Sequence, residues 1–175
     1  MSTQNSRLSI YDSPQLYDDI MWWKKDDIEF WSSIINKNKS KKILELCCGT
    51  GRIGRPLIKQ GLDYYGLDLS QKFISHFKSK VTDSNYNLNH IRTADVRKFN
   101  INQIFDFIFI GFNSLAHLLT NKDIENCFNS IKNHMNSNTI FAIDIFVPHT
   151  SFLYRDYKDK FNIMDFLYSK TNEKI

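Results

Sequence analysis

The chain has 175 residues, of which 42% are hydrophobic and 14% aromatic, with a formal net charge of +4 and a pI near 8.9. This length and composition indicate one folded domain and argue against a disordered chain. No apolar run approaches the roughly 18 residues of a membrane span, and the N-terminus lacks the pattern of a secretory leader. The lysines are scattered, so nucleic acid is not expected as the main partner.

The first 40 residues are expected to form a helical arm. Ser13-Pro14 offers a helix N-cap followed by proline at the first helical position, and apolar residues recur at helical spacing over residues 15–36. An interruption near Asp26 predicts two helical pieces, which would act as a lid. The pair Trp22-Trp23 is expected to pack in the core or the lid.

Residues 41–148 alternate between short apolar segments and helical segments. Helices are expected after Gly51, after the N-cap residue Ser70 and after Thr120, and a short irregular helix is expected near residues 97–103. This alternation predicts an α/β fold with a doubly wound, mostly parallel, Rossmann-like sheet of about five strands and helices on both faces. The expected strands are Lys42 to Cys47, Tyr64 to Leu69, Asn89 to Ala94, Phe105 to Phe112 and Thr139 to Phe146.

The most informative motif is Gly49-Thr-Gly51-Arg-Ile-Gly54, which follows the first strand and precedes Asp68 at the end of the second. Glycines let the backbone approach a ligand, and an acid about 20 residues on can accept ribose hydroxyls. The motif therefore predicts a nucleotide-cofactor site. Glu45 would repel a pyrophosphate at the turn but would suit an ammonium group. Together with Asp95 after the third strand, this acid favours S-adenosylmethionine over NAD.

Four segments in order resemble the motifs of class I S-adenosylmethionine-dependent methyltransferases, from about Tyr11 to Pro148. A closer resemblance is to the glycine N-methyltransferase-like group of small-molecule enzymes, through the loop Gly111-Phe-Asn-Ser-Leu-Ala-His-Leu118 and the segment Gln15-Leu-Tyr17. The four motif segments are Leu44-Glu-Leu-Cys-Cys-Gly-Thr-Gly51, Leu67-Asp-Leu-Ser70, Thr93-Ala-Asp-Val96 and Phe105-Asp-Phe-Ile-Phe-Ile110.

The resemblance implies a role for each candidate residue and no metal. Asn113, Tyr17 and His117 are the candidate catalytic residues; the first two would face the methyl acceptor, and His117 would close the cofactor side. The implied cofactor contacts are Glu45 and Cys47 at the ammonium, Gly49 and Gly51 along the methionine portion, Asp68 at the ribose, Asp95 and Val96 at the adenine, and Ile110 closing the cofactor side. Leu69 is a further implied cofactor contact.

Structural alternatives remain open for several of these residues. Glu45 could be a charge at a strand end, Asp95 a helix cap, and His117 a hydrogen-bonded histidine in a turn. Residues 144–147 also stand where glycine-type enzymes carry an arginine for the substrate carboxylate. We therefore expect a small-molecule acceptor with another nitrogen or oxygen nucleophile. An NAD-dependent oxidoreductase and a nucleic-acid methyltransferase are lesser alternatives.

The short C-terminal extension, residues 149–175, is expected to belong to the same domain. Class I methyltransferases complete their sheet with two further strands, and this extension resembles only the start of that hairpin. The fifth strand would then be an exposed edge, covered by the extension or by a second subunit in a homodimer. A further alternative is a truncated S-adenosylmethionine-binding protein with reduced or no catalysis.

The cysteine pattern indicates the redox state of the compartment in which the protein works. Cys47, Cys48 and Cys127 are odd in number and two are adjacent, which is a poor pattern for a disulfide framework or a zinc site. We expect a reducing cytoplasm, with Cys48 and Cys127 as small apolar core residues.

Overall fold

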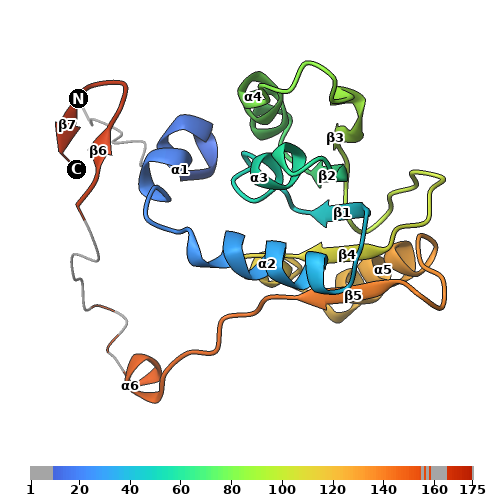
Figure 1. The fold of residues 1–175 in the computed structure, drawn as a ribbon. Coiled ribbons are helices and arrows are strands. Elements are labelled where there is room, and N and C mark those ends of the chain that lie inside the picture. Colours follow the sequence, from blue (N-terminus) through green and yellow to red (C-terminus); the bar gives the residue numbers. More distant parts are fainter. Residues whose placement is uncertain (1–9, 155, 157, 159–164, 175) are drawn as a thin grey trace.

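A five-stranded parallel sheet forms the centre of the computed structural model, which describes residues 10–154, 156, 158 and 165–174 (Figure 1). The strand order β3-β2-β1-β4-β5 reverses direction between β1 and β4, which makes that point the switch where ligands bind in such sheets. The predicted doubly wound sheet is confirmed. The strands are β1 (Lys42–Leu46), β2 (Asp63–Asp68), β3 (Ile91–Thr93), β4 (Phe107–Ile110) and β5 (Ile140–Ile143).

Helices cover both faces of the sheet because successive side chains of each buried strand point to opposite faces. Ile43 of β1 packs in a cluster with residues of α2, α3 and α4, whereas its neighbour Leu44 packs in a cluster with residues of α5. Ser70 and Thr120 cap α4 and α5 with their hydroxyl groups, as predicted. The helices are α2 (Asp26–Lys37), α3 (Gly54–Lys59), α4 (Gln71–Lys80) and α5 (Asn121–Lys132), with short 3-10 turns at Ile10–Asp12, Leu88–His90 and Ser114–His117.

The arm consists of two helices, as predicted, although residues 1–9 lie outside the described residues. α1 (Pro14–Ile20) starts at Ser13, whose Oγ accepts a hydrogen bond from the Leu16 N–H at 3.3 Å. Trp31 of α2 is buried against the sheet. The predicted packing of Trp22-Trp23 is wrong: these side chains are 60% and 45% exposed, because they lie in the turn between the two helices.

The helix expected near residues 97–103 is absent, since this segment forms turns and irregular backbone. Its apolar side chains, Phe99 and Ile101, are buried against the α5 face of the sheet. The segment is pinned by His134, whose Nε2 accepts a hydrogen bond from the Ile101 N–H at 2.9 Å. The segment is therefore held in place by its two buried side chains and by the hydrogen bond to His134, without forming a helix.

The C-terminal extension forms a short helix, α6 (Thr150–Leu153), and a hairpin of β6 (Leu167–Tyr168) and β7 (Glu173–Lys174); residues 155, 157, 159–164 and 175 lie outside the described residues. Ser169 donates two hydrogen bonds to Asp19 of α1, at 2.9 Å from its N–H and 2.8 Å from its hydroxyl. The hairpin thus lies beside α1 and away from β5 (Figure 1). In the described part of the chain, β5 pairs only with β4, so the hairpin does not cover the sheet edge.

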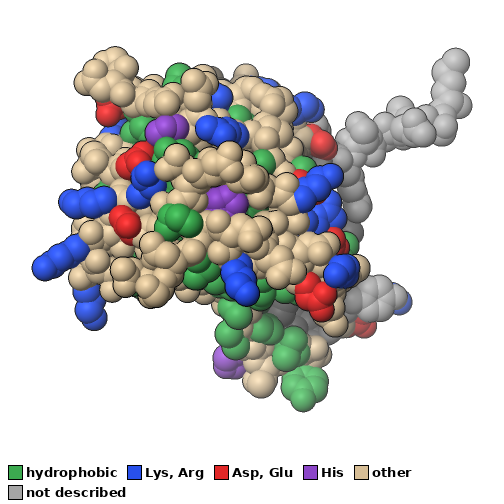
Figure 2. Space-filling model, turned by 90° about the vertical axis from the view of Figure 1, so that its right-hand side faces the viewer, with side chains coloured by type: hydrophobic (Ala, Val, Ile, Leu, Met, Phe, Trp, Pro, Cys, Tyr) green, Lys and Arg blue, Asp and Glu red, His purple; other side chains and the backbone are tan. Residues whose placement is uncertain are grey.

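One face of the molecule combines dispersed charges with an apolar region (Figure 2). Figure 2 shows Lys and Arg side chains spread over the face it presents, with acidic and neutral groups between them. Apolar side chains gather below, where the chain leaves β5 towards α6, and this segment contains the exposed residues Ile145, Phe146 and Val147. Among the described residues, no helix is long and apolar enough to cross a membrane.

Candidate cofactor site

The glycine turn lies directly after β1, at the switch point of the sheet. Gly49 and Gly51 have φ values of +57° and +78°, a region that glycine adopts without strain. A Cβ on Gly51 would lie 2.2 Å from the Phe77 ring, so the absence of a side chain there is needed for packing. At Gly49 the nearest atom would be Phe73 Cδ2, at 3.9 Å. Gly49 therefore keeps room for a ligand to approach the backbone.

Glu45 is a buried acid beneath this turn, only 3% exposed. Its Oε2 accepts a hydrogen bond from the Tyr64 hydroxyl at 2.5 Å. Burial raises the pKa of Glu45 to about 8, although the Tyr64 hydrogen bond and the charge of Arg52 favour the carboxylate. A mere strand-end charge would be exposed to water, and Glu45 is not.

Asp68 ends β2 with both carboxylate oxygens oriented by backbone groups. The Gly49 N–H donates to Oδ2 at 2.9 Å, and the Ser70 N–H donates to Oδ1 at 2.8 Å. Burial raises the pKa of Asp68, and these two hydrogen bonds oppose that rise. A carboxylate has about four lone-pair positions, so each oxygen can still accept a further hydrogen bond.

Asp95, after β3, is engaged by a neighbouring arginine. Arg97 donates to its carboxylate from Nε at 2.9 Å and from Nη2 at 2.8 Å, and it bonds Asp123 of α5 at 2.9 Å. This contact holds the pKa of Asp95 below its ordinary value. The Asp95 carboxylate also accepts from the Arg97 N–H in a turn rather than at a helix start, so the helix-cap alternative does not apply.

All three acids act electrostatically on Cys47, which follows β1 and adopts a φ of +59°. Burial raises the pKa of the Cys47 thiol to about 12, and the charges of Asp68, Glu45 and Asp95 add to that rise. These acids come from three neighbouring strands, and their fields overlap at the glycine turn. Of the remaining predicted contacts, Val96 and Ile110 are buried in the α5-side cluster, and Leu69 is exposed.

Four aromatic side chains, Tyr11, Tyr17, Phe73 and His117, form an aromatic roof beside the turn. Tyr17 of α1 lies 5.5 Å from the Phe73 ring and 6.3 Å from the Tyr11 ring, and the Tyr11 hydroxyl lies 3.4 Å from His117 Nε2. Burial raises the pKa of Tyr17 to about 12. Asp68 contributes to that shift, and His117 in turn favours the Asp68 carboxylate. The structure therefore brings two predicted site residues, Tyr17 and His117, close to Asp68.

The third candidate catalytic residue, Asn113, lies in the loop after β4. Phe112 and Asn113 are both left-handed, with φ values of 51° and 57°. The loop is tied to the end of β5, since the Phe112 N–H donates to Asp144 Oδ2 and Asn113 Oδ1 accepts from the Phe146 N–H, each at 3.2 Å. The Asn113 oxygen is thus used internally, and a contact with an acceptor falls to its Nδ2.

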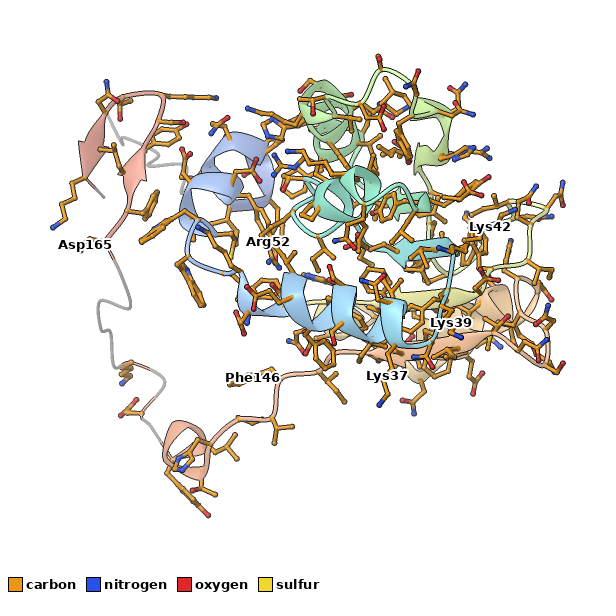
Figure 3. All side chains as sticks on the ribbon, in the orientation of Figure 1. Lys37, Lys39, Lys42, Arg52, Phe146 and Asp165 are labelled. Atoms are coloured by element: carbon orange, nitrogen blue, oxygen red, sulfur yellow. The ribbon has the colours of Figure 1, made fainter. Side chains whose placement is uncertain are left out.

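Sequence reasoning missed Arg52, which projects from the glycine turn to the place where α1 and the start of α2 meet (Figure 3). Its partner is Asp27 of α2, 2.6 Å away. One signal was available, because Arg52 is a charged residue inside the glycine motif itself. Its partner could not be read from the sequence, since Asp27 lies 25 residues earlier on a separate helix.

Comparison with known proteins identifies the family. Residues 43–138, more than half of the chain, match the family model described as a methyltransferase domain. The chain therefore belongs to the methyltransferase-domain family.

Two curated relatives and one solved structure illustrate the similarity. The Bacillus subtilis protein YqeM, named as a methyltransferase, is 30% identical over 140 residues, which are 78% of this chain and 54% of that protein. The dTDP-3-amino-3,4,6-trideoxy-alpha-D-glucopyranose N,N-dimethyltransferase of Streptomyces venezuelae is 22% identical over 106 residues, 61% of this chain and 43% of that enzyme. An S-adenosylmethionine-dependent methyltransferase from Clostridium acetobutylicum matches with a TM-score of 0.62 and 26% identity, over 74% of this chain and 55% of that one. The chain spans about half the length of the curated relatives it matches.

Proposed function

We propose that this protein binds S-adenosylmethionine at the glycine turn and transfers its methyl group to a nitrogen or oxygen of a small-molecule acceptor. The observation that carries the proposal is the set of acids at the glycine turn: Asp68 accepts the Gly49 N–H at 2.9 Å, and Glu45, Asp68 and Asp95 all act electrostatically on Cys47, directly after β1. An ammonium group would favour the ionised form of Glu45, whose pKa is about 8 without a ligand, and would suit the nearby Asp68 and Asp95, whereas a pyrophosphate would be disfavoured by all three acids. Membership of the methyltransferase-domain family supports the same assignment.

The residues present fit this cofactor. The open face of Gly49 leaves room for the methionine portion, and Glu45 would pair with the ammonium group. Asp68 has lone pairs left for two ribose hydroxyls, and Asp95 would share its carboxylate between Arg97 and an adenine amino group. When bound, S-adenosylmethionine would supply an electrophilic methyl group on its sulfonium, with the neutral thioether S-adenosylhomocysteine as the leaving group.

The protein's own part in the reaction is alignment. A neutral amine needs no dedicated base, so orientation of the acceptor and exclusion of water carry the catalysis. Tyr17 and Asn113 would orient the acceptor, His117 would close the cofactor side, and α1 and α2 would form the lid. A relative acts on an amino sugar nucleotide, which makes an amine on a sugar-like acceptor the first class to test.

Calorimetric titration with S-adenosylmethionine, S-adenosylhomocysteine and NADH tests the cofactor assignment. We expect both adenosyl-sulfur ligands to bind and NADH not to bind. Asp68→Asn should weaken S-adenosylhomocysteine binding by about 100-fold, because it loses charge-assisted hydrogen bonds to the ribose. Binding of NADH alone would overturn the assignment.

Methyl transfer is tested separately, with labelled S-adenosylmethionine and a panel of amino sugars and other small amines and alcohols. Label in an acceptor supports the enzyme, whereas cofactor binding without transfer supports the alternative of a binding protein with reduced or no catalysis. On a confirmed acceptor, Tyr17→Phe and Asn113→Ala should lower turnover. Unchanged turnover in both variants would contradict the assigned acceptor contacts.

We also propose a cytoplasmic location and a homodimer formed through the β5 edge. Three free thiols at Cys47, Cys48 and Cys127 support a reducing compartment. The outer edge of β5, unpaired among the described residues, supports the dimer.

A further inference from the structure

Arg52 makes a set of buried contacts that the proposed cofactor chemistry does not use. Its Nη1 and Nη2 donate to the two oxygens of Asp27 at 2.7 and 2.6 Å, and Nη1 also donates to the Lys24 carbonyl at 3.0 Å. Its guanidinium carbon lies 4.9 Å from the centroid of the Phe112 ring. The side chains of Arg52 and Asp27 are only 13% and 6% exposed.

These contacts join three segments that are distant in sequence. Asp27 and Lys24 belong to the arm, Arg52 to the glycine turn, and Phe112 to the loop that carries Asn113. A lysine at position 52 would keep the charge but lose the planar fork that holds both Asp27 oxygens and stacks on Phe112.

The location of the pair indicates what it controls. Arg52 and Asp68 both act electrostatically on Tyr17 of the aromatic roof, and Arg52 also acts on Glu45. A buried ion pair adds little net stability compared with an apolar pair of similar size, and in some proteins it fixes relative geometry instead. The geometry fixed here is that of the arm against the turn.

We propose that Arg52 is a positioning residue, which holds the arm and the Phe112-Asn113 loop on the glycine turn so that Tyr17 and Asn113 reach the same bound ligand. The inference rests on the proposed function. It implies that the Asp27 carboxylate is needed for ligand binding although it touches no ligand, because it orients the guanidinium.

Two readouts test the proposal in the whole protein: S-adenosylhomocysteine affinity by calorimetry, and the rate of trypsin cleavage at the Lys24-Lys25 bond by mass spectrometry. The second readout is direct, since Arg52 donates to the carbonyl of that bond. Arg52→Gln and Asp27→Asn should each weaken binding and accelerate cleavage by about tenfold or more. The double variant should be no worse than the poorer single variant, and Arg52→Lys should recover only part of the loss.

Matched controls lie close by. Glu29→Gln removes an exposed acid in the same first turn of α2, and Arg92→Gln removes an exposed arginine on β3. Both should leave affinity and cleavage unchanged, and thermal unfolding should show every variant folded at the assay temperature.

The outcomes separate the two proposals. If Arg52 only received a ligand carboxylate, Asp27→Asn would free it and strengthen binding, which would overturn the positioning role. Unchanged cleavage in Arg52→Gln would also overturn it. If the wild-type protein failed to bind S-adenosylhomocysteine, the proposed function would fail, whereas the cleavage rates would still measure the attachment of the arm.

Discussion

Glu45 is a carboxyl group whose protonation differs between the folded and unfolded chain. Its pKa is about 8 in the folded protein against an ordinary value of 4.5. Between these values the folded state binds more protons than the unfolded state, so the Glu45 contribution to stability is present below about pH 4.5 and is lost as the pH rises through 8.

A Glu45→Gln variant isolates this effect, because glutamine keeps an acceptor for Tyr64 but does not titrate. Between pH 5 and 8, the stability of wild type relative to the variant should fall by about 1 kcal/mol per pH unit, measured by urea unfolding. Parallel pH curves for the two proteins would show that Glu45 is ionised in the folded state at neutral pH.

Gly49 and Gly51 should respond differently to alanine. Gly51→Ala places a Cβ against the Phe77 ring and should destabilise the protein by about 3 kcal/mol or more. Gly49→Ala meets no close atom, so it should cost only about 1 kcal/mol of backbone strain while weakening S-adenosylhomocysteine binding. Thermal unfolding measures the loss of stability and calorimetry measures the loss of affinity. Equal destabilisation of the two variants would contradict the prediction.

At the residue scale, the positions of the acids along the strands could be predicted from the sequence, whereas their roles stay a prediction. Glu45 lies within β1 and Asp68 ends β2, and parallel pairing of the two strands places Glu45 opposite Gly66, two residues before Asp68. The Asp27–Arg52 and Glu45–Tyr64 pairs were not predicted. Each depends on how two segments meet in space, which spacing along the chain does not specify.

Among the elements, all five strands and the capped helices were predicted. The spacing of apolar residues and the residue types at helix N-caps can both be read from a short stretch of sequence. The segment between β3 and β4 was not predicted, because its backbone follows tertiary anchors rather than a helical pattern. His134 is the main anchor: it is 1% exposed, its ring stacks on Phe99 with centroids 4.6 Å apart, and its Nδ1 lies 2.7 Å from the Ser130 carbonyl.

Removing this anchor should destabilise the fold. His134→Ala leaves the Ile101 N–H without its partner and opens a cavity, so we expect a loss of about 2–4 kcal/mol in urea unfolding. Asn129→Ala, at an exposed position of α5, the helix that precedes His134, should change stability by less than about 0.5 kcal/mol. A similar small change for both would mean that the segment is held by its apolar side chains alone.

For the whole molecule, assembly depends on the outer edge of β5, which is unpaired among the residues that the structure describes. The N–H groups of Ile140 and Asp144 bond to β4, so the alternate N–H groups, including that of Ile143, point to the outer edge. If two copies pair through this edge, Ile143→Pro should give a monomer while Ile143→Ala, which keeps the N–H, should remain dimeric. Light scattering coupled to size exclusion measures this, and a monomeric wild-type protein across the accessible concentrations would contradict the dimer.

The contact between the hairpin and α1 could not be predicted from the sequence either, because Ser169 and Asp19 are 150 positions apart. α1 is held from two sides, by His76 of α4 at Asp18 and by Ser169 at Asp19. The helix that carries Tyr17 therefore depends on residues near the far end of the chain. Random mutagenesis with selection for an altered acceptor should therefore yield substitutions in the hairpin as well as near the glycine turn.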